Sequence, residues 1–465
     1  MGSLHEANPS LWVGTTEATQ FHELHGDLWA DVVVVGAGIA GLTTAALLKA
    51  DGRRVVVVDA GRVAAGVTGY TTAKLTVLHG LIFDDLTQAF GEEGARKYAD
   101  ANLAGMATVA DLTARHGIDC DLERRSAYTY TTDPSMVEKV QAEVEAAQRL
   151  GLPATFTTDT DLPYAIEGAI RLDDQAQFHP RKFCIGLARA IDGDGSAVYE
   201  MTRATSIDDE GDQCIVETDH GTITAGFVVQ TTHLPFSDTG GFFARSHPMR
   251  SYALSARLDG PVPQGMYLSV DSPSRSVRSA RMEGEEVVIL GGEGHKVGQD
   301  PDTRERYAAL EEWSRSEFPI RSIDYRWSAQ DYVPVDHVPF VGPVSPGRDR
   351  VLVATGFKKW GMSNGSAAGV MLTDRIAGRE NPFADFFDTN RLNPRQSVKE
   401  LVKENANVVK RFIGDRLRTE TRSVADLAPG EAAVLVEGTE RVAVYRDEAG
   451  GVHAVSPVCT HMGCT

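Results

Sequence analysis

The most regular hydrophobic pattern in the chain lies between residues 32 and 58. Val32–Val35 is an uninterrupted apolar run, which is typical of a parallel strand buried on both faces. A glycine-rich turn and an apolar stretch ending near Leu48 follow it, and an all-valine run occupies Val55–Val58. This order predicts a strand, a helix and a second strand of one parallel sheet.

The rest of the chain contains three further kinds of pattern. Residues from about 160 to 335 alternate short apolar runs with Gly and Pro, which predicts a region rich in strands. Within it, the glycines of Gly291–His295 predict a turn at a strand end. Val351–Ala354 is another strand of the buried type. Helical spacing predicts helices over 84–115, 134–150 and about 364–376.

The two ends of the chain differ from the middle. Residues 1–28 contain scattered aromatic residues without clear periodicity and predict an N-terminal arm. Residues 397–418 place apolar side chains on one face, which predicts a connecting helix packed on the main body. After Ser423, short alternating stretches predict a small β module with strands at Ala433–Glu437, Val442–Arg446 and Val452–Val455.

Charge and length narrow the class of protein. The 465 residues suggest two or three domains. With 46 Lys and Arg against 65 Asp and Glu, the net charge is −19, which argues against nucleic acid or an anionic membrane as partner. No Lys or Arg precedes Lys49, so the basic region of a secretory signal is missing and a cytoplasmic location is predicted. The five cysteines are too few for a disulfide scaffold, and Cys120, Cys184 and Cys214 are expected to be buried.

The turn after the first strand carries the first chemical signal. Gly36–Gly41 reads G-x-G-x-x-G, and Asp59 follows the second strand, 18 residues after Gly41. In such a turn the glycines allow a tight bend, close approach of a pyrophosphate to the backbone, and close packing of helix on sheet. The N-terminus of the helix then attracts the phosphates. Asp59 would accept hydrogen bonds from ribose hydroxyls and disfavour a 2′-phosphate. NAD and FAD both fit this site.

A second turn far along the chain distinguishes the two nucleotides. Ala354–Gly365 forms another strand–turn–helix sequence, and its helix N-terminus could point at a group bound across the sheet. A reduced flavin carries negative charge near N1 and O2, which backbone N–H groups and a helix dipole stabilise. A simple NAD dehydrogenase has no need of this element, so the pattern favours FAD.

These motifs resemble those of the FAD-dependent glycine/D-amino-acid oxidase (DAO) superfamily. The resemblance runs from about 29 to 380 and includes Gly66–Lys74 and Pro334–Gly342. It implies that FAD lies extended on the first domain, with the loop from Thr68 to Ala73 along the flavin and the late turn closing on its pyrimidine ring. Neither loop contains Cys or His, so noncovalent FAD is predicted, with His79 as the nearest exception.

The motif and the resemblance together assign residues to the cofactor and to catalysis. Those assigned to FAD are Gly36, Gly38, Ile39, Ala40, Gly41, Asp59, Ala60, Gly61, Arg62, Thr68, Gly69, Thr71, Thr72, Ala73, Gly356, Gly361 and Met362. The resemblance implies oxidation of a C–N bond by hydride transfer to flavin N5, with hydrolysis of the imine. The candidate catalytic residues are Lys74, Arg250, Tyr252, Lys358 and Trp360. His179 is predicted to cap or pack rather than act as a base.

The end of the chain carries a separate motif. Cys459-Thr460-His461-Met462-Gly463-Cys464 resembles the first ligand box of a Rieske [2Fe–2S] domain. The resemblance implies Cys459 as a ligand of one iron, His461 as a ligand of the other, and Cys464 as a disulfide partner. A second box, C-x-x-H, is missing from the sequence. We therefore expect no cluster assembled by this chain. Truncation of a longer parent is the favoured explanation and a degenerate tail the second.

The predicted fold is α/β: a Rossmann-like FAD-binding domain, a strand-rich α+β substrate domain and a partial all-β Rieske module. The predicted divisions are an arm at 1–28, an oxidoreductase region at 29–390, a connecting helix at 391–420 and the partial Rieske domain at 421–465. Within the oxidoreductase region, FAD-binding segments are expected at about 29–119, 171–234 and 331–380, and substrate-domain segments at about 120–170 and 235–330.

Three functions fit these patterns. The first is an FAD-dependent oxidoreductase for a small amine or amino acid, whose full-length parent passes electrons through a Rieske centre, with a one-electron acceptor protein as a possible partner. The second is an NAD-linked dehydrogenase, and the third is a non-catalytic flavin electron-transfer partner. An absorption peak of oxidised flavin distinguishes the first from the second. Bleaching of that peak by an amine, but not by NADH, distinguishes the first from the third.

Overall fold

The computed structural model describes residues 8–209, 211–237, 239–298, 303–391, 423–437, 440–447 and 449–457. The chain divides into two compact units, Met1–Pro394 and Arg395–Thr465.

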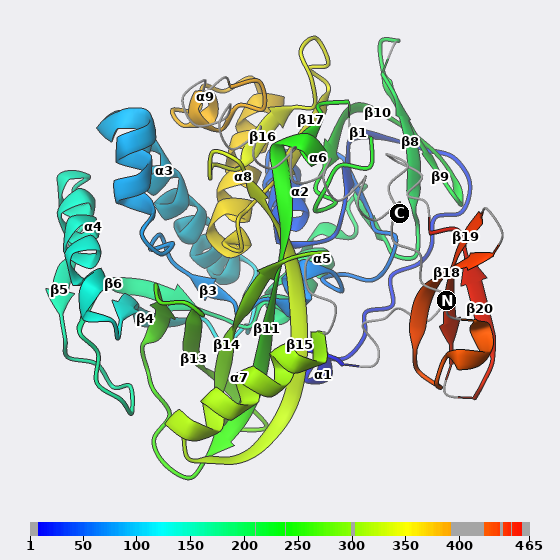
Figure 1. Cartoon of the computed structure of the whole chain (residues 1–465). Coiled ribbons are helices and arrows are strands. Elements are labelled where there is room, and N and C mark those ends of the chain that lie inside the picture. Colours follow the sequence, from blue (N-terminus) through cyan, green and yellow to red (C-terminus); the bar gives the residue numbers. More distant parts are fainter. Residues whose placement is uncertain are drawn as a thin grey trace. The chain divides into compact units, whose positions relative to one another are not determined.

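An eight-stranded sheet forms one half of the first unit (Figure 1). Its order is β16-β17-β10-β1-β2-β7, and the β8–β9 hairpin joins it at β10. Neighbours from β17 to β7 pair in parallel, while β16 and β9 are antiparallel to their partners. The predicted buried strands are confirmed. The strands are β1 (Leu28–Val35), β2 (Val55–Val58), β7 (Ala197–Tyr199), β8 (Ala204–Asp208), β9 (Cys214–Thr218), β10 (Gly221–Gln230), β16 (Phe340–Pro343) and β17 (Val351–Thr355).

Four helices pack around this sheet, and α8 contacts both α2 and α3 (Figure 1). Glycines let these helices approach each other closely. A Cβ added at Gly369 of α8 would lie 2.7 Å from Thr43 Cγ2 of α2. A Cβ at Gly105 of α3 would lie 2.4 Å from the Ser363 backbone oxygen. The predicted helices over 84–115 and 364–376 are therefore confirmed. The helices are α2 (Ile39–Ala50), α3 (Ile82–Arg115), α5 (Pro180–Ile191) and α8 (Gly361–Ile376).

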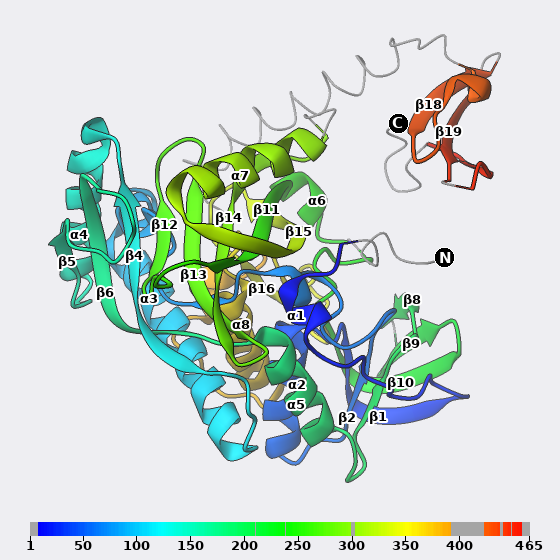
Figure 2. The ribbon, with the colours of Figure 1, turned by 90° about the horizontal axis from the view of Figure 1, so that it is seen from below.

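A nine-stranded mixed sheet forms the other half of the first unit. Its order is β15-β11-β14-β13-β12-β4-β6-β3, with β5 on β6. The helix α7 (Thr303–Glu317) crosses one face over β11, β14 and β15 (Figures 1 and 2). The strand-rich middle of the chain is confirmed. The strands are β3 (Lys74–Leu75), β4 (Glu123–Thr131), β5 (Thr155–Thr157), β6 (Gly168–Gln177), β11 (Ser246–Leu258), β12 (Met266–Ser269), β13 (Arg275–Met282), β14 (Glu285–Lys296) and β15 (Ile320–Pro334).

Alternate side chains of this second sheet face opposite cores, as the period of two requires. Leu254 and Leu290 pack toward α7. Ala253 and Trp327 belong to the core that includes α2 and α8. The sheet is therefore buried on both faces, and the face opposite α7 is turned toward the first sheet.

One turn predicted within this sheet is wrong. Gly291–His295 lies inside β14, which continues to Lys296. The pairing of β14 with β11 shifts register between Arg250 and Tyr252, and a Cβ added at Gly292 would lie 2.6 Å from Arg275 Nη1. The glycines thus mark a strand irregularity and a close approach, which produce the same sequence signal as a turn.

Shorter elements complete the first unit. The predicted helix at 134–150 is confirmed as α4 (Val137–Arg149), preceded by a 3₁₀ turn, η2 (Pro134–Met136). The N-terminal segment was predicted without regular structure, but it forms α1 (Leu11–Gly14) with Ser10 as N-cap, and Leu11 and Trp12 are buried. The remaining short elements are η1 (Val67–Tyr70), α6 (Phe242–Arg245) and α9 (Ala384–Phe387).

The described part of the second unit is a three-stranded antiparallel sheet preceded by the turn η3 (Val424–Asp426). Its strands β18 (Ala432–Glu437), β19 (Glu440–Arg446) and β20 (Val452–Val455) confirm the predicted β module. All but one residue of the predicted connecting helix at 391–420, and all of Cys459, His461 and Cys464, lie outside the described residues. No helix in the described ranges is both long and apolar enough to cross a membrane.

Candidate functional site

A cavity of about 1060 Å³ joins the two sheets of the first unit. On one side it is lined by the turn after β1 and by Asp59 after β2, at the carboxyl ends of parallel strands, where ligands of open α/β sheets bind. Phe357–Met362, which enters α8, lines the same cavity. Ser251 and Ser276 of the second sheet complete it. Two glycine-bearing turns about 320 residues apart in the chain therefore meet at one cavity.

The first turn fits a pyrophosphate. Gly36 has φ +112°, a conformation that favours glycine, and Gly38 is the N-cap of α2. A Cβ at Gly41 would lie 2.0 Å from the Gly36 backbone oxygen, so only glycine lets α2 start this close to β1. The helix N-terminus thus opens directly onto the cavity wall, as anion binding requires.

Asp59 is held by the same turn. Its carboxylate accepts hydrogen bonds from the N–H of Ala37 at 2.7 Å and of Gly61 at 2.8 Å. Burial raises the pKa of the Asp59 carboxyl, and these two backbone bonds oppose that increase. The carboxylate lines the cavity in a fixed orientation, as a ribose-binding acid requires.

Side chains from distant segments hold the loop that precedes β3. Five consecutive backbone oxygens, from Gly69 to Ala73, each accept a hydrogen bond from a side chain. The donors are Ser10 Oγ to Gly69, Trp327 Nε1 to Tyr70 (2.9 Å), Trp12 Nε1 to Thr71 (2.6 Å), and Arg278 Nη1 to Thr72 (3.0 Å) and Ala73 (2.6 Å). Because its carbonyl side is occupied in this way, the loop 69–73 has a fixed position against the cavity.

Arg278 is the central residue of this arrangement. Its side chain is buried, its guanidinium lies 5.2 Å from the centre of the Trp12 ring, and burial lowers its pKa to about 9. No carboxylate of the described residues lies within ion-pair distance of it. Backbone dipoles therefore stabilise this charge.

The late turn has an unusual backbone. Lys358 and Lys359 both have positive φ, 51° and 69°, which is strained for residues other than glycine. Asp331 stabilises the turn by accepting the Lys359 N–H at 2.5 Å. Burial lowers the pKa of Lys358 to about 8, while the Asp85 carboxylate opposes the shift. Lys359 is exposed and donates to Ser251 Oγ at 2.7 Å, so it connects the turn to β11.

Trp360 and His79 stack on each other, with ring centres 4.5 Å apart. Trp360 lines the cavity, whereas His79 is buried behind it. His79 Nδ1 lies 2.7 Å from Tyr98 Oη and Nε2 lies 3.0 Å from Ser363 Oγ. Burial lowers the pKa of His79 to about 3. Both ring nitrogens therefore already have partners, so His79 packs and hydrogen-bonds behind the cavity wall.

The other candidate catalytic residues differ in their surroundings. Lys74 lines the cavity and is 6% exposed. Arg250 also lines the cavity and has a long contact of 3.4 Å with Ser328 Oγ. Tyr252 belongs to the core under α7, where its hydroxyl lies 3.0 Å from His295 Nε2. Tyr252 also lines the cavity, while its ring packs against Tyr307 of α7, so its catalytic role stays a prediction.

The cavity brings together most residues predicted to hold the cofactor. The predicted residues that line it are Gly36, Gly38, Ile39, Ala40, Asp59, Ala60, Thr68, Thr71, Thr72, Gly361 and Met362. Those that do not line it are Gly41, Gly61, Arg62, Gly69, Ala73 and Gly356. The Arg62 guanidinium is directed elsewhere, because it pairs with the buried Glu200 carboxylate at 3.3 Å. His179 caps α5 by accepting the Lys182 N–H, as predicted.

Several residues at this site gave no signal in the sequence. Trp12 and Arg278 lie far from the glycine motifs, and Arg278 reads as an ordinary polar position of a strand. Asp331 and His233 also line the cavity, with Asp331 Oδ1 3.2 Å from His233 Nε2. Nothing local marks these residues, because their roles depend on contacts between segments distant in sequence.

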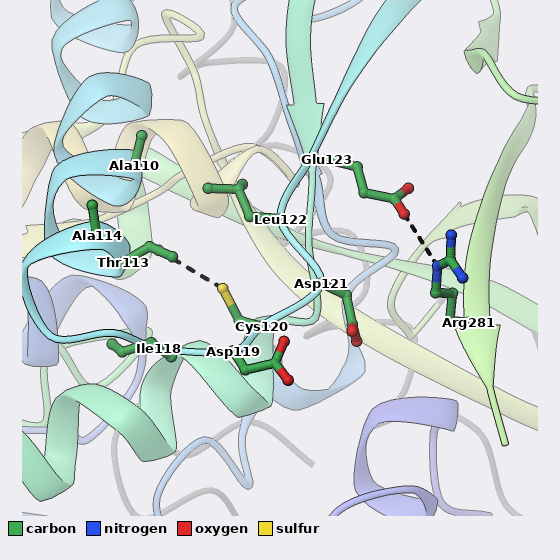
Figure 3. Close-up of a pocket in the computed structure, with 10 residues that line it drawn as sticks. All are labelled: Ala110, Thr113, Ala114, Ile118, Asp119, Cys120, Asp121, Leu122, Glu123 and Arg281. Carbon is green, nitrogen blue, oxygen red and sulfur yellow. Dashed lines mark hydrogen bonds and ion pairs between the residues drawn. The ribbon is translucent and has the colours of Figure 1, made fainter. Parts of the chain in front are cut away.

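A second cavity of about 500 Å³ contains none of the predicted residues (Figure 3). Cys120 lies at its wall, 3.7 Å from Thr113 Oγ1, and burial raises the pKa of its thiol to about 11. Glu123 pairs with Arg281 at its rim (Figure 3). Cys120, Cys184 and Cys214 are all buried, as predicted. An unreactive thiol and a surface ion pair do not form a competing active site.

The fold and the cavity are those of an α/β nucleotide-binding protein. The model of the family FAD dependent oxidoreductase (DAO) matches residues 31–375, and the chain belongs to this family. The residues at the cavity fit FAD: the glycine turn brings the N-terminus of α2 to the cavity wall, and the late turn opens onto the same space. The protein is an FAD-dependent oxidoreductase.

The model of the Rieske [2Fe-2S] domain matches residues 419–465. This match counts against the expectation that this chain assembles no cluster, because the matched domain is of a type that binds one. No group of three or more His, Cys, Asp or Glu among the described residues could hold a metal. The tail motif itself lies outside them.

Known proteins share both the sequence and the fold. "Putative Rieske 2Fe-2S iron-sulfur protein YhfW" of Bacillus subtilis (strain 168) is 36% identical over 460 residues, covering 99% of this chain and 90% of the relative. Gamma-glutamylputrescine oxidoreductase of Escherichia coli (strain K12) is 23% identical and covers 79% of this chain and 88% of its own. The crystal structure of glycine oxidase from Geobacillus kaustophilus superposes with a TM-score of 0.66 at 19% identity, covering 78% of this chain and 99% of that chain.

Proposed function

We propose that this protein oxidises a C–N bond of an amine or amino acid. The observation that carries the proposal is the cavity that joins the glycine turn and the late turn to the second sheet, where Ser251, Ser276 and Gly291 line it. When bound, FAD supplies a two-electron acceptor for the hydride that leaves the carbon next to nitrogen. The substrate thereby becomes an imine, whose hydrolysis gives a carbonyl compound and an amine or ammonia.

The chain's own residues would bind and orient the reactants. Gly36–Gly41 and Asp59 would hold the nucleotide, and the loop from Thr68 to Ala73 would lie along the flavin. The N-terminus of α8 at Gly361 would face the pyrimidine ring, where it favours negative charge. On the substrate side, Lys359 and Ser251 are hydrogen-bonded to each other and present polar groups over β11. Noncovalent FAD is part of the proposal, because neither the Thr68–Lys74 loop nor the Ala354–Gly365 loop contains Cys or His; the histidines that line the cavity, His233 and His247, come from other segments.

The relatives support the class of substrate. One relative is named for its action on gamma-glutamylputrescine, an amine, and the glycine oxidase has a similar fold. We extend the substrate class from these proteins to this chain as a proposal. An NAD-linked dehydrogenase is disfavoured, because the family match is to FAD-dependent enzymes.

We further propose that electrons pass from the flavin to a Rieske centre, in a cytoplasmic enzyme. A Rieske cluster takes two Cys and two His, and Cys459 and His461 would supply one of each. A two-electron acceptor beside a one-electron carrier suits transfer to a protein or quinone in single steps. The divisions at 29–390 and 421–465 are proposed as the two functional domains.

Anaerobic reduction of the purified full chain tests the main proposal. Primary and secondary amines and D- and L-amino acids are added one at a time while flavin absorbance is followed. We expect at least one of them to bleach the flavin and NADH to leave it oxidised. Bleaching by NADH alone, or by none of these compounds, would contradict the proposed reaction.

A further inference from the structure

The surroundings of Lys74 suggest a role that the family match does not assign. Lys74 is the first residue of β3 and directly follows the loop 69–73. Its side chain is buried, yet it lines the cavity. A buried lysine at a cavity wall is placed where a proton can be exchanged with a bound ligand.

The partners of the Lys74 nitrogen are neutral. Nζ donates to the Tyr267 backbone oxygen and, at 2.6 Å, to Ser276 Oγ. No carboxylate of the described residues lies within ion-pair distance of it. Gln177 of β6, which pairs with Lys74 in the sheet, is also neutral. An ammonium group at this position would therefore have no counter-charge.

A second buried cation lies beside it. Arg278 of β13 is held by the carbonyls of Thr72 and Ala73, next to Lys74 in the chain. Burial and the Arg278 charge lower the pKa of Lys74 well below its usual range. The Glu123 carboxylate of β4 partly opposes the lowering of the Arg278 pKa. The nearby Asp161 carboxylate accepts a hydrogen bond from the Tyr267 hydroxyl. The groups that face Lys74 thus favour its neutral amine form.

The cavity wall beside Lys74 is made of small groups. Ser276 pairs with Gly291 across β13 and β14. A Cβ added at Gly291 would lie 3.4 Å from Ser276 Cβ and 3.7 Å from Thr72 Cγ2. Gly291, Ser276 and Thr72 therefore form one patch of the wall, and no large side chain of the patch separates the Lys74 site from a ligand.

Building on the proposed amine oxidation, we propose that Lys74 accepts the proton that the ammonium form of the substrate must lose before hydride transfer. One N–H bond of the substrate breaks and one N–H bond forms at Lys74 Nζ, and no electrons move in this step. The two electrons leave afterwards with the hydride, to the acceptor already described. Ser276 and Arg278 are positioning residues, because one holds Nζ and the other holds the loop beside it.

The test uses an amine that bleaches the flavin of the wild-type full chain, with kcat/KM measured from pH 6 to 10. In Lys74→Met we expect a loss of about 100-fold or more near pH 7, the usual size of a general-base contribution. The loss should shrink about tenfold per pH unit as the substrate nears its own pKa, because the substrate then loses its proton without help. FAD content and the KM at high pH should stay close to wild type.

Two further variants keep the test decisive. Lys139→Met removes an exposed lysine on α4, away from the cavity, and should leave the profile unchanged. Ser276→Ala removes one hydrogen bond of Nζ and should give a smaller loss with the same pH dependence, which serves if Lys74→Met does not fold. An equal loss at every pH in the Lys74 and Ser276 variants would overturn this inference and leave the oxidase proposal intact. Absence of bleaching by any amine in the wild type would instead overturn the proposed function.

Discussion

The two ends of the cavity are built in different ways. At the glycine end, Gly36, Gly38 and Gly41 shape the site with backbone alone, within one turn between a strand and a helix. At the sheet end, side chains from β13, β15 and the N-terminal segment converge on the loop 69–73. A Cβ added at Gly36 or Gly41 would clash with backbone atoms of the protein. The loop 69–73, in contrast, is held by several hydrogen bonds, each of which contributes only part of its stability. A substitution at the glycine end should therefore remove most of the FAD binding. A substitution at the sheet end should reduce FAD binding or stability only by the contribution of the hydrogen bonds that it removes.

The largest effect is expected for Gly41→Ala. Its Cβ would lie 2.0 Å from the Gly36 oxygen, so α2 cannot start close to β1. We expect the variant to keep less than about a tenth of the wild-type FAD, which is at least about 1.4 kcal/mol of binding free energy. Gly211→Ala is the matched control, because nothing lies within 4 Å of its Cβ. FAD released from equal amounts of protein measures both, and a full FAD content in Gly41→Ala would contradict this expectation.

Arg278→Met should give an intermediate effect at the sheet end. The backbone oxygens of Thr72 and Ala73 lose a donor, at about 1–3 kcal/mol each, so the free energy of unfolding should fall by about 2–6 kcal/mol. Arg281→Met, three residues later in β13, removes an exposed arginine and should change it by less than about 1 kcal/mol. Urea unfolding of the FAD-bound protein compares the two. Equal stabilities would show that Arg278 does not hold the loop.

Trp12→Phe should have the smallest effect of the three. The ring can still pack on Arg278, and only the N–H to the Thr71 oxygen is lost. At about 1 kcal/mol for one hydrogen bond, FAD affinity should fall about fivefold. Trp29→Phe, at an exposed position of β1, is the control and should bind FAD as the wild type does. A complete loss of FAD in Trp12→Phe would mean that the sheet end is as intolerant as the glycine end.

This contrast also explains what the sequence could predict. The strands at Val32–Val35 and Val55–Val58, the glycine turn and the strands of the C-terminal module were all readable, because each depends on neighbours in the chain. Trp12 and Arg278 were not, because their partners lie about 60 and 205 residues away. Contacts between residues so far apart in the chain produce no periodic pattern of hydrophobic and polar positions in the sequence.

The wrong prediction of a turn at Gly291–His295 has the same origin. Gly291 was interpreted as part of a turn because glycine signals turns and strand irregularities alike, and only the pairing of β14 with β11 distinguishes them. The pair of Arg62 with the buried Glu200, 138 residues later, likewise has no local signal, because it depends on a contact between distant segments.

The central claim is that one FAD spans the cavity from the glycine end to the late turn. A crystal structure of the full chain with FAD bound tests this most directly. The account predicts the pyrophosphate at Gly38 and the isoalloxazine ring between Thr72 and Met362. Density for FAD that contacts Gly38 but leaves Met362 and Thr72 free, or that occupies the cavity of Figure 3, would contradict it.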